Sequence, residues 1–233
     1  MVAVFSGLAT LSSPSSAVAV PSDFVRLSDE RTRTHSAVVL RSAWVRASPR
    51  RRGRRLARLG AATWHGSPEV VLLLGEGTVG GRRWAYIRYP GIGSRRGWVP
   101  ASALSSTTLH TKRLVLDRAR LRLKLFRGER LLFRARVGIG ALGSPTPAGR
   151  YYVRERLGPF ANPNSVYGVL AFGLSAFSPY RTDWPGGGQV GIHGTNQPSL
   201  IPGRISNGCV RLRNARVRRL GRLLQIGAPL LIK

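Results

Sequence analysis

The sequence predicts a mainly β protein with two consecutive β domains and one or two short helices. Three observations support this fold class. Short apolar runs separated by turn residues fill residues 37–105, apolar and charged residues alternate from Leu121 to Leu125, and helical spacing of apolar residues is readable only near the C-terminus. With 233 residues, 42% of them hydrophobic, the chain can bury one core or two small ones.

Residues 1–36 precede the first predicted strand and show no periodicity, so we expect a leader followed by a linker. The triplet Ala17-Val18-Ala19 has the small-x-small form of a signal-peptide cleavage site, but the basic start of a signal peptide is missing, because the first arginine is Arg26. We interpret the segment as a signal remnant or a start codon assigned too late, with a disordered leader as the alternative. No apolar run approaches the roughly 18 residues of a membrane-spanning helix.

The net charge of +29 comes almost entirely from arginine. Such a field favours polyanions, namely nucleic acid, an anionic membrane surface or an anionic cell wall. A genome-wide preference for arginine codons explains the charge equally well. Nucleic-acid binding would interleave aromatic residues with arginine on one surface, whereas here the aromatic residues fall at expected core positions. We therefore do not expect nucleic acid as a partner, and we keep anionic wall polymers as a candidate.

Residues 37–105 are predicted to form a small β-barrel. The segments Trp44–Pro49, Trp84–Arg88 and Gly97–Leu104 resemble those of a bacterial SH3-type domain, which implies an SH3-like fold. The run Arg50–Arg55 is more basic than the usual loop of that family. Its simplest interpretation is a solvated loop, and contact with a polyanion is the alternative. Residues 106–111 are predicted to be a linker.

The second predicted domain covers residues 112–233. The turn Arg127–Glu129 should join two strands into a hairpin, because apolar residues alternate with charged ones before it and strand composition resumes after it. The two prolines in Ser144–Gly149 exclude a helix or a central strand, and Arg150–Val153 returns to strand composition. Near the C-terminus we expect a helix followed by a last strand. Asn214 is its predicted N-cap, Val217, Leu220, Leu223 and Leu224 form its apolar face, Gly227 follows its end, and Pro229–Lys233 is the strand.

The only cysteine, Cys209, follows His193 by sixteen residues in a glycine-rich stretch. A thiol at neutral pH needs a base to become a nucleophile, so this pair indicates acyl transfer with Cys209 as nucleophile and His193 as base. The alternative is a small buried cysteine and an ordinary loop histidine. Gly194 and Gly208 remove side-chain bulk beside the pair, where a substrate backbone must approach closely.

Three further groups are candidates for supporting this chemistry. The amides of Gly208 and Cys209 could stabilise an oxyanion. If Cys209 and Arg211 share a strand face, the guanidinium could lower the thiol pKa and hold a substrate carboxylate, although Arg211 could equally be a solvated arginine. Asp183 is the nearest acid that could orient the imidazole of His193, and we prefer a backbone carbonyl for that role.

The segment before the histidine carries aromatic residues that could form a substrate lid, although core packing is the safer assignment for most of them. We expect Gly186–Gly188 to be either a mobile connection feeding the site or an inert turn. We expect no metal and no cofactor, because the four histidines lack ligand-like spacing and there is one cysteine. The four aromatic residues are Phe172, Phe177, Tyr180 and Trp184.

Two motifs resemble the catalytic domain of the L,D-transpeptidase (YkuD-type) family. The segments Pro185–Thr195 and Ser206–Leu212 match its signature of a His-Gly pair, a spacer of about fifteen residues and Ser-x-Gly-Cys-x-Arg. The earlier segments Leu121–Phe126, Gly138–Gly140 and Ser144–Gly149 match its opening hairpin and Thr-Pro-x-Gly loop. The resemblance spans residues 112–233 and implies a β-sandwich-type domain.

The resemblance also implies roles for single residues. Cys209 would be the nucleophile and His193 the general base, and the implied orienting or oxyanion residues are Gly194, Gly208 and Ser206. Asn207, Arg211 and Thr195 would bind substrate. One departure is Arg216, which stands where the family usually has an acidic residue.

The reaction implied is formation of 3→3 cross-links between peptidoglycan stem peptides through a thioester, outside the cytoplasm at the cell wall. An L,D-carboxypeptidase and an enzyme that attaches proteins to the wall are the alternatives within the family. Outside enzymes, the alternative is a basic protein that binds a cell-wall polymer.

Overall fold

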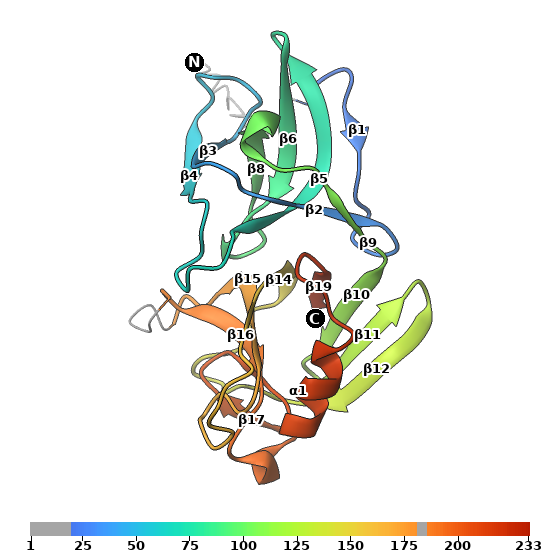
Figure 1. The fold of residues 1–233 in the computed structure, drawn as a ribbon, viewed down its shortest axis with the longest axis vertical. Coiled ribbons are helices and arrows are strands. Elements are labelled where there is room, and N and C mark those ends of the chain that lie inside the picture. Colours follow the sequence, from blue (N-terminus) through green and yellow to red (C-terminus); the bar gives the residue numbers. More distant parts are fainter. Residues whose placement is uncertain (1–19, 181–185) are drawn as a thin grey trace, which may run out of the picture.

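The computed structural model describes residues 20–180 and 186–233, and it contains two β-sheets, one above the other in Figure 1. We call residues 20–110 the N-terminal part and residues 111–233 the C-terminal part. The mainly β prediction is confirmed. Across the described ranges there is one α-helix, α1 (Asn214–Gly221), together with two single-turn 3₁₀ helices, Ala101–Ala103 and Pro198–Leu200. None of the described helices is long and apolar enough to cross a membrane.

The N-terminal sheet is antiparallel and has the order β4-β3-β8-β6-β5-β2-β9, with β1 paired to β5. Its core contains Val45, Val71, Leu73, Ile87 and Val99, which all have 1% exposure or less. The strands are β1 Val25–Arg26, β2 Thr34–Val38, β3 Ala43–Arg46, β4 Arg55–Leu59, β5 Val70–Val79, β6 Arg82–Arg88, β8 Arg96–Pro100 and β9 Thr108–His110.

This sheet extends beyond the bounds 37–105 expected from the sequence. Strands β1 and β2 begin within the predicted leader, and β9 lies within the predicted linker 106–111. Polar residues hide these strands in the sequence, because Thr34 and Ser36 are buried although they are polar. The Ser36 hydroxyl lies 2.7 Å from Nε2 of His110, which joins β2 to β9. The proposed leader residues 1–19 lie outside the described ranges.

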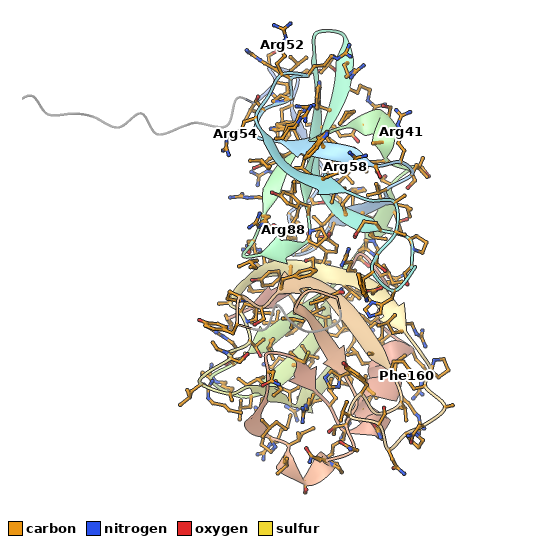
Figure 2. All side chains as sticks on the ribbon, turned by 90° about the vertical axis from the view of Figure 1, so that its left-hand side faces the viewer. Arg41, Arg52, Arg54, Arg58, Arg88 and Phe160 are labelled. Atoms are coloured by element: carbon orange, nitrogen blue, oxygen red, sulfur yellow. The ribbon has the colours of Figure 1, made fainter. Side chains whose placement is uncertain are left out.

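The Arg50–Arg55 run forms a solvated loop, as its simplest interpretation predicts. Arg52 and Arg54 are exposed and project from the N-terminal part (Figure 2). At the end of the run, the guanidinium of Arg55 stacks over the ring of Trp44 at 4.7 Å, a cation–π contact.

The C-terminal sheet has the order β12-β11-β10-β19-β14-β15-β16-β18-β13-β17. The predicted hairpin is confirmed, with Gly128 in its turn at φ 55° and Leu123 and Leu125 fully buried. Leu121 precedes the strand instead of belonging to it, because its φ of 48° places it in a left-handed turn. The strands are β10 Lys112–Asp117, β11 Arg122–Arg127, β12 Arg130–Arg136, β13 Gly138–Gly140, β14 Gly149–Leu157, β15 Ala171–Phe177, β16 Gln189–His193, β17 Gly203–Ser206, β18 Val210–Arg211 and β19 Pro229–Ile232.

The C-terminal helix is shorter than its apolar pattern predicts. Helix α1 ends at Gly221, so Leu223 and Leu224 follow it rather than forming its last turn, and Gly227 lies further from the helix end than predicted. The predicted N-cap is wrong: Arg213 occupies that position without a capping hydrogen bond, because the side chain of Asn214 is used elsewhere. The predicted last strand is confirmed as β19.

The two parts are joined by contacts of several kinds. Tyr152 of β14 is fully buried against Leu72 and Leu74 of β5. Beside this cluster, Arg154 and Glu69 form a buried ion pair, with Nε donating to Oε1 at 2.8 Å. Strand β7 (Gly91–Ile92), from the N-terminal part, pairs in parallel with the end of β15. Main-chain, ionic and apolar contacts therefore all fix one part against the other.

Candidate functional site

Two neighbouring strands bring Cys209 and His193 together. Strand β16 ends at His193, and β18 begins directly after Cys209. They pair in parallel, with Ile192 opposite Val210. The two preceding residues, Gly191 and Cys209, therefore also lie side by side. The amide of Gly191 accordingly donates a hydrogen bond to Sγ of Cys209 at 3.3 Å.

Gly191 also lies close to both reactive side chains. A methyl group added there would lie 3.9 Å from Cδ2 of His193 and 4.0 Å from Sγ of Cys209. The thiol and the imidazole therefore both border the same point above Gly191. The sequence did not single out Gly191, because a glycine beside a histidine has many ordinary explanations.

A backbone carbonyl orients the imidazole. Nδ1 of His193 lies 2.7 Å from the carbonyl oxygen of Gly194, so this nitrogen carries the hydrogen and leaves Nε2 as the free acceptor. The ring of Tyr167 packs edge-on against the imidazole, with centroids 5.1 Å apart. The alternative orienting acid, Asp183, lies outside the described residues, as does Trp184.

Burial controls the protonation of the pair. It lowers the pKa of His193 to about 4; the Gly194 carbonyl opposes this shift and Arg211 adds to it. Burial also raises the pKa of the Cys209 thiol, against the opposing effects of the Gly191 amide and the Arg211 charge. At neutral pH the resting pair is therefore a thiol beside a neutral imidazole, and the imidazole is in the form that can accept a proton.

The loop before Cys209 is held by two hydroxyl groups. Ser206 Oγ donates to the carbonyl of Cys209 at 2.6 Å and accepts the amide of Gly208 at 3.2 Å. Thr146 Oγ1, fully buried, donates to the carbonyl of Gly208 at 2.8 Å. The Gly208 amide would have to leave Ser206 before it could serve an oxyanion. Gly208 itself has a φ of 113°, which few other residues adopt.

Asn214 supports the histidine side of the site. Its Oδ1 accepts the amide of Thr195 at 3.1 Å, and its Nδ2 donates to the carbonyl of Pro163 at 3.4 Å. A methyl group on Gly194 or on Gly168 would lie 2.2 Å or 2.1 Å from the same Oδ1. The space left by Gly194 is thus filled by Asn214 and not by substrate. The sequence shows Asn214 at a helix start, where a cap is the simpler explanation.

Two cavities meet at the reactive pair. The larger has a volume of about 500 Å³ and the smaller about 140 Å³. Cys209 is half-buried and borders both cavities together with His193. The residues common to both linings are Tyr167, Gln189, Val190, His193 and Cys209.

The other predicted site residues are distributed unevenly. Ser206, Asn207 and Arg211 line the smaller cavity, whereas Thr195 is buried and borders neither cavity. Nε of Arg211 is buried and has no hydrogen-bond partner in the described part of the chain. The guanidinium group of Arg211 lines the smaller cavity, and a guanidinium there suits a carboxylate ligand.

The aromatic residues of the supposed lid fall in different places. Phe172 is buried and borders the larger cavity. Phe177 lies under the guanidinium of Arg154, and Tyr180 is 58% exposed. Gly188 lines the smaller cavity. Nowhere in residues 20–180 and 186–233 do three or more potential metal ligands gather.

Residues 111–232 match the family model of the L,D-transpeptidase catalytic domain, YkuD. The chain belongs to this family. Among curated relatives, it is 30% identical over 105 residues to a putative L,D-transpeptidase YkuD of Bacillus licheniformis, covering 45% of this chain and 55% of the relative. It is 31% identical over 143 residues to the probable L,D-transpeptidase YbiS of Escherichia coli, covering 55% and 46%.

The chain therefore spans about half the length of the curated relatives it matches. Among solved structures, the catalytic domain of an Enterococcus faecium L,D-transpeptidase aligns over 52% of this chain and 96% of its own, with 22% identity and a TM-score of 0.38. The matched L,D-transpeptidase region contains both Cys209 and His193.

Proposed function

We propose that the protein is a peptidoglycan L,D-transpeptidase that forms 3→3 cross-links between stem peptides, with Cys209 as nucleophile and His193 as general base. The observation that carries the proposal is the position of this pair at the junction of two cavities. A transfer reaction needs room for a donor and an acceptor around one reactive atom, whereas hydrolysis needs room for one peptide and water.

In the first half-reaction, Nε2 of His193 takes the thiol proton as Sγ of Cys209 attacks the carbonyl carbon of the third residue of the donor stem. The carbon–nitrogen bond breaks, the proton passes to the leaving amine, and D-alanine departs. The Gly191 amide stabilises the developing charge on sulfur, because it already donates to that atom. The amide of Cys209 is our candidate donor to the oxyanion, with the Gly208 amide as a second donor once it leaves Ser206.

Substrate recognition is assigned to the smaller cavity. Arg211 would bind a carboxylate of the stem peptide through its guanidinium group, with Asn207 beside it. Ser206 keeps the nucleophile in place through the Cys209 carbonyl. Thr195 and Gly194 act indirectly, by fixing the segment that follows the base.

In the second half-reaction, the side-chain amine of a neighbouring stem attacks the thioester and releases the thiolate. Water attacking the same thioester would give carboxypeptidase activity, and an amine on a protein would give wall attachment. The reaction places the enzyme outside the cytoplasm, at the cell wall. The N-terminal part, for which we propose an SH3-like role in wall contact, is docked firmly on the catalytic part.

The test is intact mass after incubation with a stem tetrapeptide and, separately, with a carbapenem. We expect an acyl adduct on the wild type and none on Cys209→Ala. Persistence of the adduct in Cys209→Ala would locate the chemistry elsewhere. Cross-linked and hydrolysed products of the tetrapeptide, separated by mass, measure the ratio of transfer to hydrolysis.

A second proposed activity is binding of an anionic wall polymer. A cavity of about 470 Å³ lies between the β11–β12 hairpin and the start of α1, and no carboxylate of residues 20–180 or 186–233 lines it. Arg216, the departure from the family pattern, is one of the arginines there. Clustered cations without acidic partners favour a multivalent anion. The five arginines are Arg122, Arg134, Arg136, Arg213 and Arg216.

Co-sedimentation with cell walls that keep or lack their anionic polymers tests this binding. In a Cys209→Ala background, we expect the double variant Arg134→Gln/Arg216→Gln to bind several-fold less than its parent to walls that keep the polymers. On walls that lack the polymers, the two proteins should bind equally. The matched control is Arg52→Gln/Arg54→Gln, which removes the same charge from the exposed loop. A greater loss in the control would assign the contact to that loop.

A further inference from the structure

The N-terminal part contributes a turn to the wall of the catalytic cavity. His65 lines the larger cavity together with Cys209 and His193. The turn is tightly built: Thr63 Oγ1 accepts the amides of His65 and Ser67, both at 3.2 Å. The imidazole of His65 is thus presented to the cavity by a fixed backbone.

A buried carboxylate lies behind this imidazole. The side chain of Glu155, on β14, has no exposed surface. Thr63 Oγ1 donates to its Oε2 at 2.7 Å, and Nδ1 of His65 lies 3.2 Å from its Oε1. A carboxylate at Nδ1 fixes the hydrogen on that nitrogen, so Nε2 of His65 is left with a free lone pair.

The charges around the two cavities indicate which of them the cationic acceptor amine enters. Arg211 lines the smaller cavity and would repel an ammonium group. Among the described residues, the larger cavity has no Arg or Lys in its lining, and Glu155 lies behind His65. The cationic acceptor amine should therefore approach through the larger cavity. Besides His193, the one imidazole in the lining of this cavity, among the residues that the structure describes, is that of His65.

An alkyl ammonium must lose a proton before it can attack a thioester. With an ordinary amine pKa of about 10.4, on the order of one molecule in a thousand is unprotonated at pH 7. His193 has one transfer of its own to perform, because the attacking nitrogen loses a second proton when the amide forms. A separate acceptor for the first proton would remove this limit on the rate.

We propose that His65, held by Glu155, is the base that deprotonates the acceptor amine; the proposal rests on the transpeptidase function given above. The ammonium proton passes to Nε2 of His65, and the free amine forms a carbon–nitrogen bond with the thioester carbonyl. The carbon–sulfur bond breaks, its electron pair stays on Sγ of Cys209, and the remaining excess proton on nitrogen goes to His193. The side chain of His65 is 36% exposed, so it can return its proton to water.

The experiment compares two acceptors on the acyl-enzyme formed with a stem tetrapeptide. One is an alkyl amine resembling the natural acceptor, and the other is hydroxylamine, which is already unprotonated at pH 7. We expect His65→Gln to acylate at the wild-type rate and to transfer to the alkyl amine at least tenfold more slowly at pH 7. The deficit should vanish with hydroxylamine and shrink as the pH approaches 10.

The matched control is His35→Gln, since His35 bonds the carbonyl of Leu27 at 2.9 Å away from both cavities and should leave every rate unchanged. As a second variant, His65→Ala should regain transfer when imidazole is added. Equal slowing with both acceptors, no slowing, absent rescue, or failure of His65→Gln to acylate would each overturn the assignment. Failure of the proposed function itself would look different, because the wild type would then form no acyl-enzyme.

Discussion

The resting protonation of the reactive pair can be tested by alkylating the thiol across a pH range. Burial raises the pKa of Cys209 and lowers that of His193 to about 4, so a thiolate–imidazolium pair should not exist in the free enzyme. A thiol with the ordinary pKa of about 8.5 is roughly 3% ionised at pH 7, and Cys209 should be ionised less than that. The rate of alkylation should then rise about tenfold per pH unit above neutrality.

Iodoacetamide followed by intact mass measures this rate directly, because the chain has one cysteine. Between pH 6.5 and pH 8.5 the alkylation rate of native protein should increase about a hundredfold. In Arg211→Gln the curve should move to higher pH, since the guanidinium is one of the groups that lower the pKa of Cys209. A rate that is flat from pH 5 to pH 8 would mean a preformed ion pair and would refute the reasoning.

The low pKa of His193 also predicts how the acylation rate depends on pH below neutrality. General-base catalysis requires a neutral imidazole, and a pKa of about 4 keeps His193 neutral down to that pH. The acylation rate per enzyme should therefore be level between pH 7 and pH 5, and should fall tenfold per unit only below about pH 4. A fall centred near pH 6.5 would show that the ring is solvated in the working enzyme.

Three further predictions concern stability. Since the unfolded chain binds a proton at His193 near pH 6.5 and the folded chain near pH 4, the free energy of unfolding should drop by about 3 kcal/mol as the pH falls through that window, and less in His193→Gln. Asn214→Ala leaves the Thr195 amide without its acceptor, and should cost about 1–3 kcal/mol in urea unfolding and slow acylation. Glu69→Ala leaves the buried guanidinium of Arg154 unpaired and should cost about 3–5 kcal/mol, measured in the same way.

Glu76 provides the control for the buried pair, because its partner Arg83 is 71% exposed at the side chain. Glu76→Ala should cost no more than about 1 kcal/mol, as is usual for a surface ion pair. Equal losses in Glu69→Ala and Glu76→Ala would mean that the contact between the two parts contributes little to folding. A Glu69→Ala variant that unfolds in two separate transitions would show that the parts fold independently.

The sequence predicts those elements whose side chains alternate strictly. Leu123 and Leu125 revealed β11 because a half-buried strand separates leucine from arginine at every step. The same reasoning failed at Thr34 and Ser36, since a buried hydroxyl looks like a linker residue until its partner is known. Strand pairing between distant segments supplies that partner, and no local pattern contains it.

The candidate site shows the same division. The family signature identified Cys209 and His193 as a candidate pair, because two glycine-flanked motifs at a fixed spacing are rare by chance. It did not reveal His65 or Glu155, which meet across the contact between the two parts. Asn214 was assigned to a helix start, because the amide it serves lies nineteen positions earlier. Contacts of long sequence separation are the ones that single motifs leave out.

The short strand β7 has a consequence for anyone who wishes to isolate the catalytic part. Its residues Gly91 and Ile92 pair with the main chain of Ala176 and Phe177 at the end of β15. A fragment that begins at residue 111 would expose those amides and carbonyls. It would also lose the apolar residues that pack on Tyr152 and the carboxylate of Glu69 that pairs with Arg154. Such a truncated protein should self-associate through the exposed end of β15, so its properties would not represent those of the whole chain.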